Sequence, residues 1–474
     1  MIRLFKVSIP SNVILLVISE AILVLCCYLL ATYWTMDAAA DVFLFDDGGI
    51  WHITFIAAVI LLGIYFHDLY ENYRIRTRTL LIQQFCMILG IAFLLQAMAN
   101  YGHWNALLLP KWVMVYGSLL VLIVVPTWRV LFATFVAKAM GAQRLLFLGS
   151  SAAVREIIAR VSDRAELGLS AIGYLDDGAA PPDGGDNLPA APANIPGAPR
   201  LGTIEDLDDV VATQNPERII VGMTERRQRL PVLRLLELRY SGIHIEDAAN
   251  TYEAVFGRVS TRDLRPSQLI FSTELGPRRS SMTLQTFYSL IISVIGIVVT
   301  LPVMLVVALT VRLTSPGPAL FRQRRVGLNG AQFTLYKFRS MRADSEAKTG
   351  AVWAKKDDPR VTPVGRWLRK LRLDELPQLF NVLRGEMSIV GPRPERPEFV
   401  AVLQEKIPYY RQRHCVKPGI SGWAQINHKY GDTIEDAMIK LEYDLYYIKN
   451  MAVSLDAYIM FHTAKIMLLG RGAY

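Results

Sequence analysis

Two adjacent carboxylates, Asp374 and Glu375, stand among many basic residues in the C-terminal half of the chain. A carboxylate can attack a phosphorus atom, and a second carboxylate can hold a divalent metal ion. Nearby arginines and lysines would neutralise the charge that builds up on phosphoryl oxygens. Taken alone, the pair is weak evidence for catalysis. Such pairs are more often surface acids that form i, i+4 ion pairs with the basic face of a helix.

The sequence around the pair contains further motifs. Lys337 and Arg339 alternate, which places both on one face if they lie in a strand. Residues 364–383 carry apolar side chains at helical spacing, which predicts an amphipathic segment on a bilayer surface. In chain order the motifs are Phe321-Arg322-Gln323 with Arg325 and Gly327, Lys337-Phe338-Arg339-Ser340-Met341, Leu373-Asp374-Glu375-Leu376-Pro377-Gln378-Leu379, Gly391-Pro392-Arg393-Pro394, and Lys417-Pro418-Gly419-Ile420-Ser421-Gly422-Trp423-Ala424-Gln425.

The 474-residue chain also contains long apolar runs, in keeping with its hydrophobic residue content of 52%. Four runs lie within residues 1–140, and each approaches the roughly 20 residues that a helix needs to cross a bilayer. The sequence therefore predicts an N-terminal domain of four transmembrane helices over residues 1–140. The runs are Asn12–Tyr33, Trp51–Leu69, Leu80–Ala99 and Trp112–Val136.

The loops between these runs differ in charge. Arg3 and Lys6 precede the first run and three arginines follow the second, whereas the loop after the first run has four aspartates and no lysine or arginine. The positive-inside rule therefore places both ends of the four-helix domain in the cytoplasm. The first run is long enough to span and lacks a small-residue cleavage site, so we expect no cleavable signal.

Residues 141–275 alternate predicted strands and helices, which is typical of a doubly wound, Rossmann-like parallel sheet. The first turn, Gly149–Ala153, lacks the G-x-G-x-x-G pattern that lets a backbone approach a pyrophosphate. We therefore expect a structural or regulatory domain rather than a dinucleotide-binding one. The expected strands are 144–149, 171–175 and 218–221, the expected helices are 152–161, 204–213 and 230–241, and a Gly/Pro-rich loop is expected at 178–199.

A fifth apolar run, Leu284–Val311, lies near the start of the C-terminal part, residues 276–474. Pro302 lies within it and would remove one backbone hydrogen bond and kink a helix. The residues alone are compatible with two structures. One is a re-entrant helix that bends at Pro302 and returns to the same face of the membrane, and the other is a kinked helix that spans the membrane. The basic residues that follow favour the first only weakly, because long domains can cross a membrane regardless of charge.

The net charge, the cysteines and the histidines limit the kinds of ligand that the sequence predicts for this protein. The formal net charge of +9 suits phosphate-bearing substrates and anionic lipid headgroups. No nucleic-acid-binding motif accompanies that charge, so nucleic acid is not expected as a partner. None of the four cysteines has metal-ligand spacing, and the seven histidines form no cluster of the HxxH or HxxxH type.

Taken together, the motifs resemble those of the bacterial sugar transferases, the monotopic polyprenyl-phosphate glycosyl-1-phosphate transferases. The resemblance covers about Thr283 to Tyr474, and the N-terminal helices and α/β domain match the long form of the family. The segments Ile2–Lys6 and Gly470–Gly472 are similar to the subgroup found with exosortase-linked exopolysaccharide systems. The resemblance implies an α-rich catalytic domain with a re-entrant membrane helix and surface amphipathic helices, on the cytoplasmic face of the bacterial inner membrane.

The resemblance also implies a ping-pong reaction. Asp374 would attack the β-phosphorus of a UDP-sugar, release UMP and hold the sugar phosphate covalently. Undecaprenyl phosphate would then accept the sugar phosphate, which starts the synthesis of an exopolysaccharide or another surface glycan. We expect the sugar to be a hexose, the usual choice among long forms. The resemblance allows a homodimer and does not determine the oligomeric state.

Other site residues follow from the same resemblance. Glu375 would help to bind Mg²⁺. Many relatives read Asn-Gly-Arg-Asn after Trp-Ala-Gln, whereas this chain has Asn427-His428-Lys429-Tyr430. Lys429 would stand in for the arginine as a phosphate-binding or sugar-binding residue, but without its bidentate fork. The remaining phosphate-binding or ordering residues would be Lys337, Arg339, Arg369 and Arg393.

Two other functions are weighed against the transferase. An oxidoreductase acting on nucleotide sugars would need a Gly-rich turn after Leu148, and that turn is absent. A catalytically silent scaffold that senses nucleotide sugars for a polysaccharide assembly would need a broken Asp-Glu pair, and the pair is intact. The length and order of the motifs favour the transferase.

Overall fold

The computed structural model describes residues 2–70, 78–104, 107–136, 141–176, 195–223, 229–262, 279–342, 358–428, 431 and 433–469. The chain divides into two compact units. The first unit comprises Met1–Ile2, Ile9–Ser150 and Ile158–Glu246. The second comprises Arg3–Ser8, Ser151–Ile157 and Asp247–Tyr474.

The four apolar runs predicted near the N-terminus form long helices. They are α1 (Ser11–Met36), α2 (Gly49–Phe66), α3 (Arg78–Tyr101) and α4 (Lys111–Leu131), with short helical turns after α1 and α4. All four are long and apolar enough to cross a membrane. α1 packs on α4, where Gly117 lets the ring of Tyr28 approach, since a Cβ at Gly117 would lie 2.4 Å from Tyr28 Cδ1.

A buried ion pair that was not predicted from the sequence lies inside this helical group. Arg129 on α4 donates from Nε to Glu20 Oε1 at 2.5 Å and from NH2 to Glu20 Oε2 at 2.9 Å. Its NH1 donates to the carbonyl of Leu69 at 2.9 Å. A buried charge is tolerated only when it is paired and hydrogen-bonded, so each residue requires the other.

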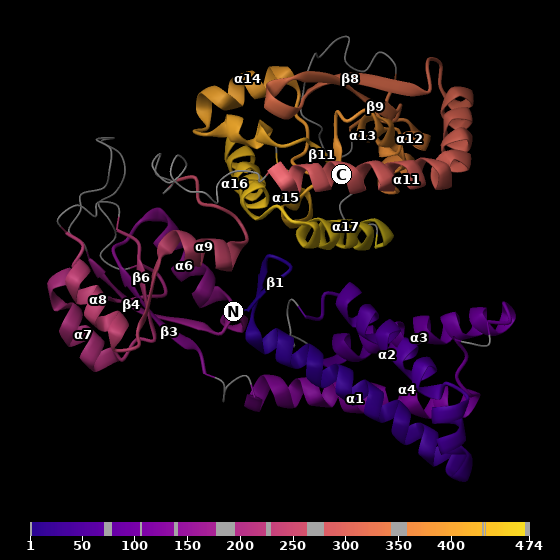
Figure 1. The fold of residues 1–474 in the computed structure, drawn as a ribbon, viewed down its shortest axis with the longest axis horizontal. Helices are drawn as coiled ribbons and strands as arrows, with labels where there is room; N and C mark the ends of the chain where they lie inside the picture. The colour runs from indigo at the N-terminus through magenta and orange to yellow at the C-terminus, as the bar shows by residue number, and fades with distance from the viewer. Residues whose placement is uncertain are drawn as a thin grey trace. The chain divides into compact units, whose positions relative to one another are not determined.

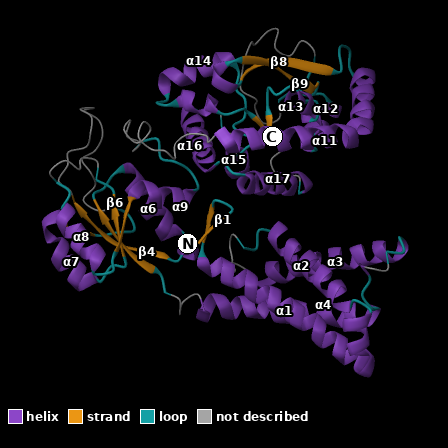
Figure 2. Cartoon of the chain, in the orientation of Figure 1, coloured by secondary structure: helices purple, strands orange, loops and turns teal. Residues whose placement is uncertain are grey.

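The middle of the chain forms a five-stranded parallel sheet, as predicted (Figure 2). The strand order β5-β4-β3-β6-β7 places the first strand, β3, at the centre. β5 and β7 are short and were not predicted. Residues 178–194 of the predicted loop lie outside the described residues. The strands are β3 (Gln143–Leu148), β4 (Leu169–Asp176), β5 (Arg200–Thr203), β6 (Arg218–Val221) and β7 (His244–Asp247), and the helices between them are α6 (Ala152–Asp163), α7 (Leu207–Gln214) and α8 (Val232–Tyr240). α9 (Ala248–Phe256) follows β7 in the chain and belongs to the second unit.

The C-terminal part is mainly helical, as expected. A two-stranded antiparallel sheet, β8 (Leu320–Val326) with β9 (Gln332–Phe338), and a parallel pair, β10 (Ser388–Val390) with β11 (Gly419–Ser421), interrupt the helices. The helices are α11 (Arg279–Thr314), α12 (Pro363–Lys370), α13 (Gln378–Leu383), α14 (Pro397–Lys406), α15 (Trp423–Asn427), α16 (Ile434–Asn450) and α17 (Val453–Leu468), with 3-10 helices η8 (Leu373–Glu375) and η9 (Tyr410–Cys415).

α11 contains the fifth apolar run and Pro302. It is the fifth helix in the described chain that is long and apolar enough to cross a membrane. Figure 1 shows its ribbon turning to a new direction before the chain reaches β8. Near its start, the buried side chain of Gln285 donates to the Val390 carbonyl at 3.1 Å and to Asp456 Oδ2 at 2.8 Å. Most apolar side chains of α11 are exposed.

The predicted amphipathic segment 364–383 is not one continuous helix. α12 ends at Lys370, and Arg372 then takes a left-handed conformation with φ 54°. η8 carries the two carboxylates, and α13 begins after Pro377. A left-handed residue cannot continue a right-handed helix, so the chain turns sharply just before Asp374. On α12, Trp367 is 65% exposed, which leaves a large apolar side chain on the surface.

β10 and β11 bring together the glycines of two sequence motifs. A Cβ at Gly419 would lie 2.1 Å from the backbone nitrogen of Gly391, and one at Gly422 would lie 2.3 Å from the Gly391 carbonyl oxygen. Both distances are far inside van der Waals contact. The glycines in these motifs are therefore required by the close approach of two backbone segments.

Candidate active site

The two carboxylates lie at the turn between α12 and α13. Both Asp374 and Glu375 are 8% exposed. Leu373 and Leu376 on either side pack against the cluster formed by Met304, Val307 and Val311 of α11 with Phe338 and Leu368. This packing fixes the turn on the second half of α11, so the carboxylates are held next to the apolar helix.

Three basic side chains converge on Glu375. Lys337 Nζ donates to Glu375 Oε1 at 2.8 Å, and Arg393 NH2 donates to the same oxygen at 3.0 Å. Arg372 NH1 lies 3.6 Å from Oε2. Burial alone would raise the pKa of Glu375, but the charges of Lys337, Arg393 and Arg372 outweigh it and hold this pKa well below its usual range. Glu375 is therefore ionised throughout the physiological pH range.

Asp374 has a different electrostatic environment. Burial, and then the negative charge of Glu375, raise the pKa of Asp374 above its ordinary value. The charges of Lys337, Arg369 and Arg393 oppose that rise without cancelling it. Two neighbouring carboxylates thus have pKa values moved in opposite directions, which is a common property of catalytic acid pairs.

Lys337 and Arg393 reach Glu375 from separate elements. Lys337 lies in β9, and burial lowers the pKa of its ammonium group, against the attraction of Glu375. Arg393 lies in the turn after β10. Arg413 NH2 donates to the Arg393 carbonyl at 2.9 Å, and Arg325 NH1 donates to the Pro394 carbonyl at 3.0 Å. Two arginines therefore fix the backbone of this turn and direct Arg393 at Glu375.

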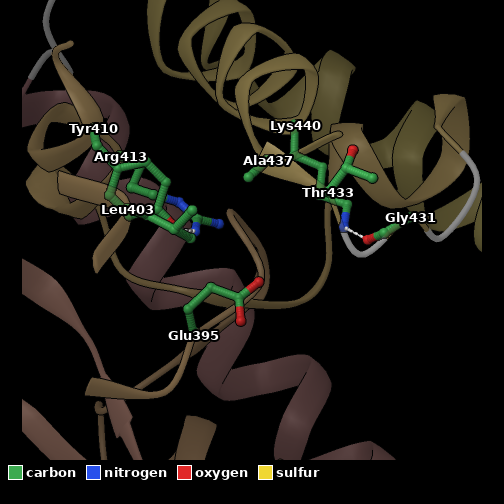
Figure 3. A pocket seen from close by; sticks show the side chains of 8 residues that line it. All are labelled: Glu395, Leu403, Tyr410, Arg413, Gly431, Thr433, Ala437 and Lys440. Carbon is green, nitrogen blue, oxygen red and sulfur yellow. Dashed lines mark hydrogen bonds between the residues drawn. The ribbon is translucent and has the colours of Figure 1, made fainter. Parts of the chain in front are cut away.

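Arg413 is itself buried beside a small cavity of about 20 Å³ (Figure 3). Its NH2 lies 2.8 Å from Asp444 Oδ2 on α16, and its NH1 donates to the hydroxyl of Tyr410 at 2.7 Å. The cavity is about the size of one water molecule. Its lining includes the charged side chains of Arg413, Lys440 and Glu395 together with apolar groups. These contacts make the cluster a rigid support behind the Arg393 turn.

Arg339 and Arg369, two predicted phosphate-binding or ordering residues, contact other parts of the domain. Arg339 is 5% exposed, and its guanidinium donates to the carbonyls of Pro316 and Ser315 at 2.6 and 2.8 Å, at the end of α11. Arg369 Nε donates to Ser340 Oγ at 2.9 Å. Arg339 therefore orders the connection between α11 and β8. Arg369 influences Asp374 through its charge.

Of the remaining predicted site residues, Pro302 lies inside α11, upstream of the residues that pack on the carboxylate turn. Lys429 lies outside the described residues. Two residues that contact the site were not among the predicted site residues. Arg372 directly precedes the Leu373-Asp374 pair and Arg413 is remote in sequence, so only the basic character of Arg372 beside the acidic pair could have indicated its role.

A cleft of about 130 Å³ opens beside Glu375. Arg372 and Glu375 form one polar part of its lining, and Gln425, Ser421 and Thr463 add neutral polar groups. The rest of the lining is apolar and comes from the turn between η8 and α13, and from α13, β11, α15 and α17: Leu376, Leu379, Ile420, Ile426, Ile466 and Met467.

The site offers few ligands for a metal ion. Among the described residues, no group of three or more His, Cys, Asp or Glu side chains could hold a metal. Asp374 and Glu375 are two adjacent oxygen donors, which fits Mg²⁺, an ion that commonly takes one or two carboxylates and completes its shell with water and substrate phosphates. A metal held by four protein side chains does not fit the described residues.

Comparison with known proteins places the chain in a family. The model of the family described as "Bacterial sugar transferase" matches residues 280–470. The UDP-glucose:undecaprenyl-phosphate glucose-1-phosphate transferase of Xanthomonas campestris pv. campestris is 34% identical over 343 residues, which are 71% of this chain and 69% of that protein. The chain therefore belongs to the bacterial sugar transferase family, as the motifs predicted.

Two other relatives show how the similarity is distributed. The UDP-N-acetylgalactosamine-undecaprenyl-phosphate N-acetylgalactosaminephosphotransferase of Aeromonas hydrophila is 46% identical over 221 residues, which are 47% of this chain and 51% of that protein. The exopolysaccharide production protein PSS of Rhizobium leguminosarum bv. phaseoli is 41% identical over 187 residues, 38% of this chain and 94% of that protein. The chain thus matches about half the length of the first relative and nearly all of the shorter one.

Proposed function

We propose that the protein transfers a sugar-1-phosphate from a UDP-sugar to undecaprenyl phosphate, giving an undecaprenyl-diphosphate sugar and UMP. The observation that carries this proposal is the carboxylate pair, in which Glu375 is held ionised by three cations while Asp374, beside it, has a raised pKa. Membership of the sugar transferase family supports it, since several relatives are named for transfer to undecaprenyl phosphate.

The proposed mechanism has two steps. In the first, a carboxylate oxygen of Asp374 forms a bond to the β-phosphorus of the UDP-sugar, the bond from that phosphorus to the bridging oxygen breaks, and UMP leaves with the electron pair. In the second, a phosphate oxygen of undecaprenyl phosphate attacks the same phosphorus. The Asp374 carboxylate is then the leaving group, which returns the enzyme to its starting form.

The surrounding residues have separate parts in this proposal. Lys337 and Arg393 orient Glu375 and supply positive charge beside the transferring phosphoryl group. Arg413 and Arg339 are positioning residues, because they hold the Arg393 turn and the end of α11. Asp374 and Glu375 would hold Mg²⁺ together with the substrate phosphates, and the ion would neutralise charge on the phosphoryl oxygens.

The membrane setting supports the acceptor. The described part of the chain has five helices that could cross a membrane, and the family is membrane-bound, so the protein is membrane-associated. We place the site on the cytoplasmic face of the bacterial inner membrane, where UDP-sugars are found, and infer that α11 is re-entrant. The product would begin an exopolysaccharide or another surface glycan, in keeping with the name of the Rhizobium relative.

The decisive test is Asp374→Asn in purified protein supplied with UDP-sugar, undecaprenyl phosphate and Mg²⁺. Asparagine has nearly the same shape but is a poor nucleophile, so we expect UMP release to fall at least about a thousandfold. Glu398→Asn is the control, because Glu398 is an exposed acid outside the cluster around Glu375. Near-normal release by Asp374→Asn would remove Asp374 as the nucleophile.

The sugar is best identified with a panel of UDP-sugars in the same assay. The relatives are named for glucose and for N-acetylgalactosamine, so both belong in the panel with their epimers. If the unmodified protein releases UMP from none of these UDP-sugars, that result would favour the catalytically silent scaffold.

A further inference from the structure

The cleft beside Glu375 has two chemically different parts. One part carries the charged side chains of Arg372 and Glu375, which belong to the turn that also holds Asp374. The rest of the lining is mostly aliphatic and comes from four elements, among them α13 with Leu379 and α17 with Ile466, and it includes the neutral polar side chains of Ser421, Gln425 and Thr463. The lining therefore suits a ligand that combines a charged group, next to the turn of Asp374, with an apolar chain.

The apolar wall of the cleft is continuous with α11. Leu379 lines the cleft and also packs against α11, where a Cβ built at Gly296 would lie 3.2 Å from Leu379 Cδ1. Around Gly296, the α11 side chains of Ile295, Val298 and Val299 are each more than half exposed. An apolar chain leaving the cleft past Leu379 therefore meets the helix surface that is best suited to lipid.

On the assumption that the proposed reaction is correct, we infer that this cleft holds the first isoprenoid units of the lipid acceptor. The acceptor phosphate lies at the Arg372 end, beside the turn of Asp374, and the chain runs between α13 and α17 towards α11. Charge and apolar complementarity support this occupant, since the Arg372 guanidinium, which also pairs with Glu375 at 3.6 Å, can contact the phosphate, and the aliphatic side chains match a branched hydrocarbon. The uridine of the donor is the alternative occupant that the experiment must separate.

A matched pair of substitutions on α17 tests the inference. Ile466 lines the cleft, whereas Phe461, five positions earlier on the same helix, is not among the lining residues and is 43% exposed. Ile466→Trp should fill the cleft, and Phe461→Trp places the same side chain outside it. The two half-reactions are measured separately, as UMP released without acceptor and as sugar phosphate transferred from labelled enzyme to undecaprenyl phosphate.

We expect Ile466→Trp to raise the KM for undecaprenyl phosphate by about tenfold or more, the effect of losing about 1.4 kcal/mol of binding. The KM for the UDP-sugar should change no more than in Phe461→Trp. A rise in the UDP-sugar KM, with slower UMP release, would assign the cleft to the donor and overturn the inference. Equal acceptor KM values for the two variants would also overturn it.

A binding measurement keeps this test independent of turnover. A photoreactive p-benzoylphenylalanine is placed at Ile466 or at Phe461, and each full-length protein is irradiated with undecaprenyl phosphate in detergent. The inference requires crosslinked lipid, detected by mass spectrometry, at Ile466 well above that at Phe461, and equal crosslinking contradicts it. If the unmodified protein releases no UMP from any UDP-sugar, the proposed function fails, and the crosslinking result still decides whether the cleft binds the lipid.

Discussion

Basic residues at the carboxylate turn are distributed unequally between the two acids. Lys337, Arg393 and Arg372 contact Glu375, whereas Asp374 is affected by basic groups mainly through their charge. Glu375 is therefore fixed and ionised, and its own negative charge helps to raise the pKa of Asp374. A carboxylate with a raised pKa is a stronger base, and this makes Asp374 the better nucleophile of the pair.

The raised pKa of Asp374 predicts the pH dependence of UMP release. Only the ionised carboxylate attacks, so the rate should fall as the pH falls through the pKa of Asp374, and this fall should begin at a higher pH than for an ordinary aspartate. The positive charge of Arg369 lowers that pKa, so Arg369→Gln should move the acid limb of the pH–rate profile to higher pH.

Arg366→Gln is the matched control for this profile, because Arg366 is an exposed arginine of the same helix and is not one of the main charges that act on the pKa of Asp374. Its acid limb should coincide with that of the unmodified protein. An acid limb for Arg369→Gln that stays in place, or moves to lower pH, would contradict the electrostatic account of Asp374.

Glu375→Gln tests the proposed metal role. The substitution keeps the shape of the side chain but removes the charge that pairs with Lys337 and Arg393. We expect UMP release to require Mg²⁺, to stop when EDTA is added, and to fall about 10²- to 10³-fold in Glu375→Gln. The variant should also need more Mg²⁺ for half-maximal rate. An unchanged Mg²⁺ titration curve would leave Glu375 with a purely electrostatic role.

At the scale of elements, the sequence predicted the long helices and the central strands well, because their apolar periodicity is strong. Short elements were missed. β5 and β7 have four residues each, too few to establish a pattern. The helix break at Arg372 was also missed, because the residue types in 364–383 do not indicate a left-handed conformation at that position. The support of Arg393 by Arg413 depends on tertiary contact, which a single sequence does not reveal.

The β10–β11 pair predicts a large effect of a small change. In Gly419→Ala, the new Cβ would lie 2.1 Å from the Gly391 nitrogen, so the two strands must separate. Overpacking of this kind costs about 1–3 kcal/mol of unfolding free energy. The thermal midpoint in detergent should fall, and UMP release should fall with it because Arg393 follows β10. Gly90→Ala in α3 is the control, since a Cβ there meets nothing within 4 Å.

At the scale of the whole molecule, two kinds of apolar surface need a membrane. α1 to α4 have lengths suited to spanning, and α11 exposes aliphatic side chains along most of its length. α11 differs from the others because the described residues that follow it form a polar domain whose site would need a cytoplasmic nucleotide sugar. Its contacts also differ, since both halves of α11 pack on the C-terminal domain, through Gln285 at the start and Val311 near the end.

These contacts predict the topology of the C-terminal part. A helix whose two halves both pack on one polar domain cannot place its ends on opposite sides of a bilayer unless the domain itself enters the bilayer. We therefore expect a reporter fused after Tyr474 to be active in the cytoplasm, and one inserted between α1 and α2 at Asp47 to report the periplasm. The Asp47 fusion is the internal control for membrane insertion. A periplasmic signal at Tyr474 would make α11 a spanning helix and remove the carboxylate pair from the compartment that supplies UDP-sugars.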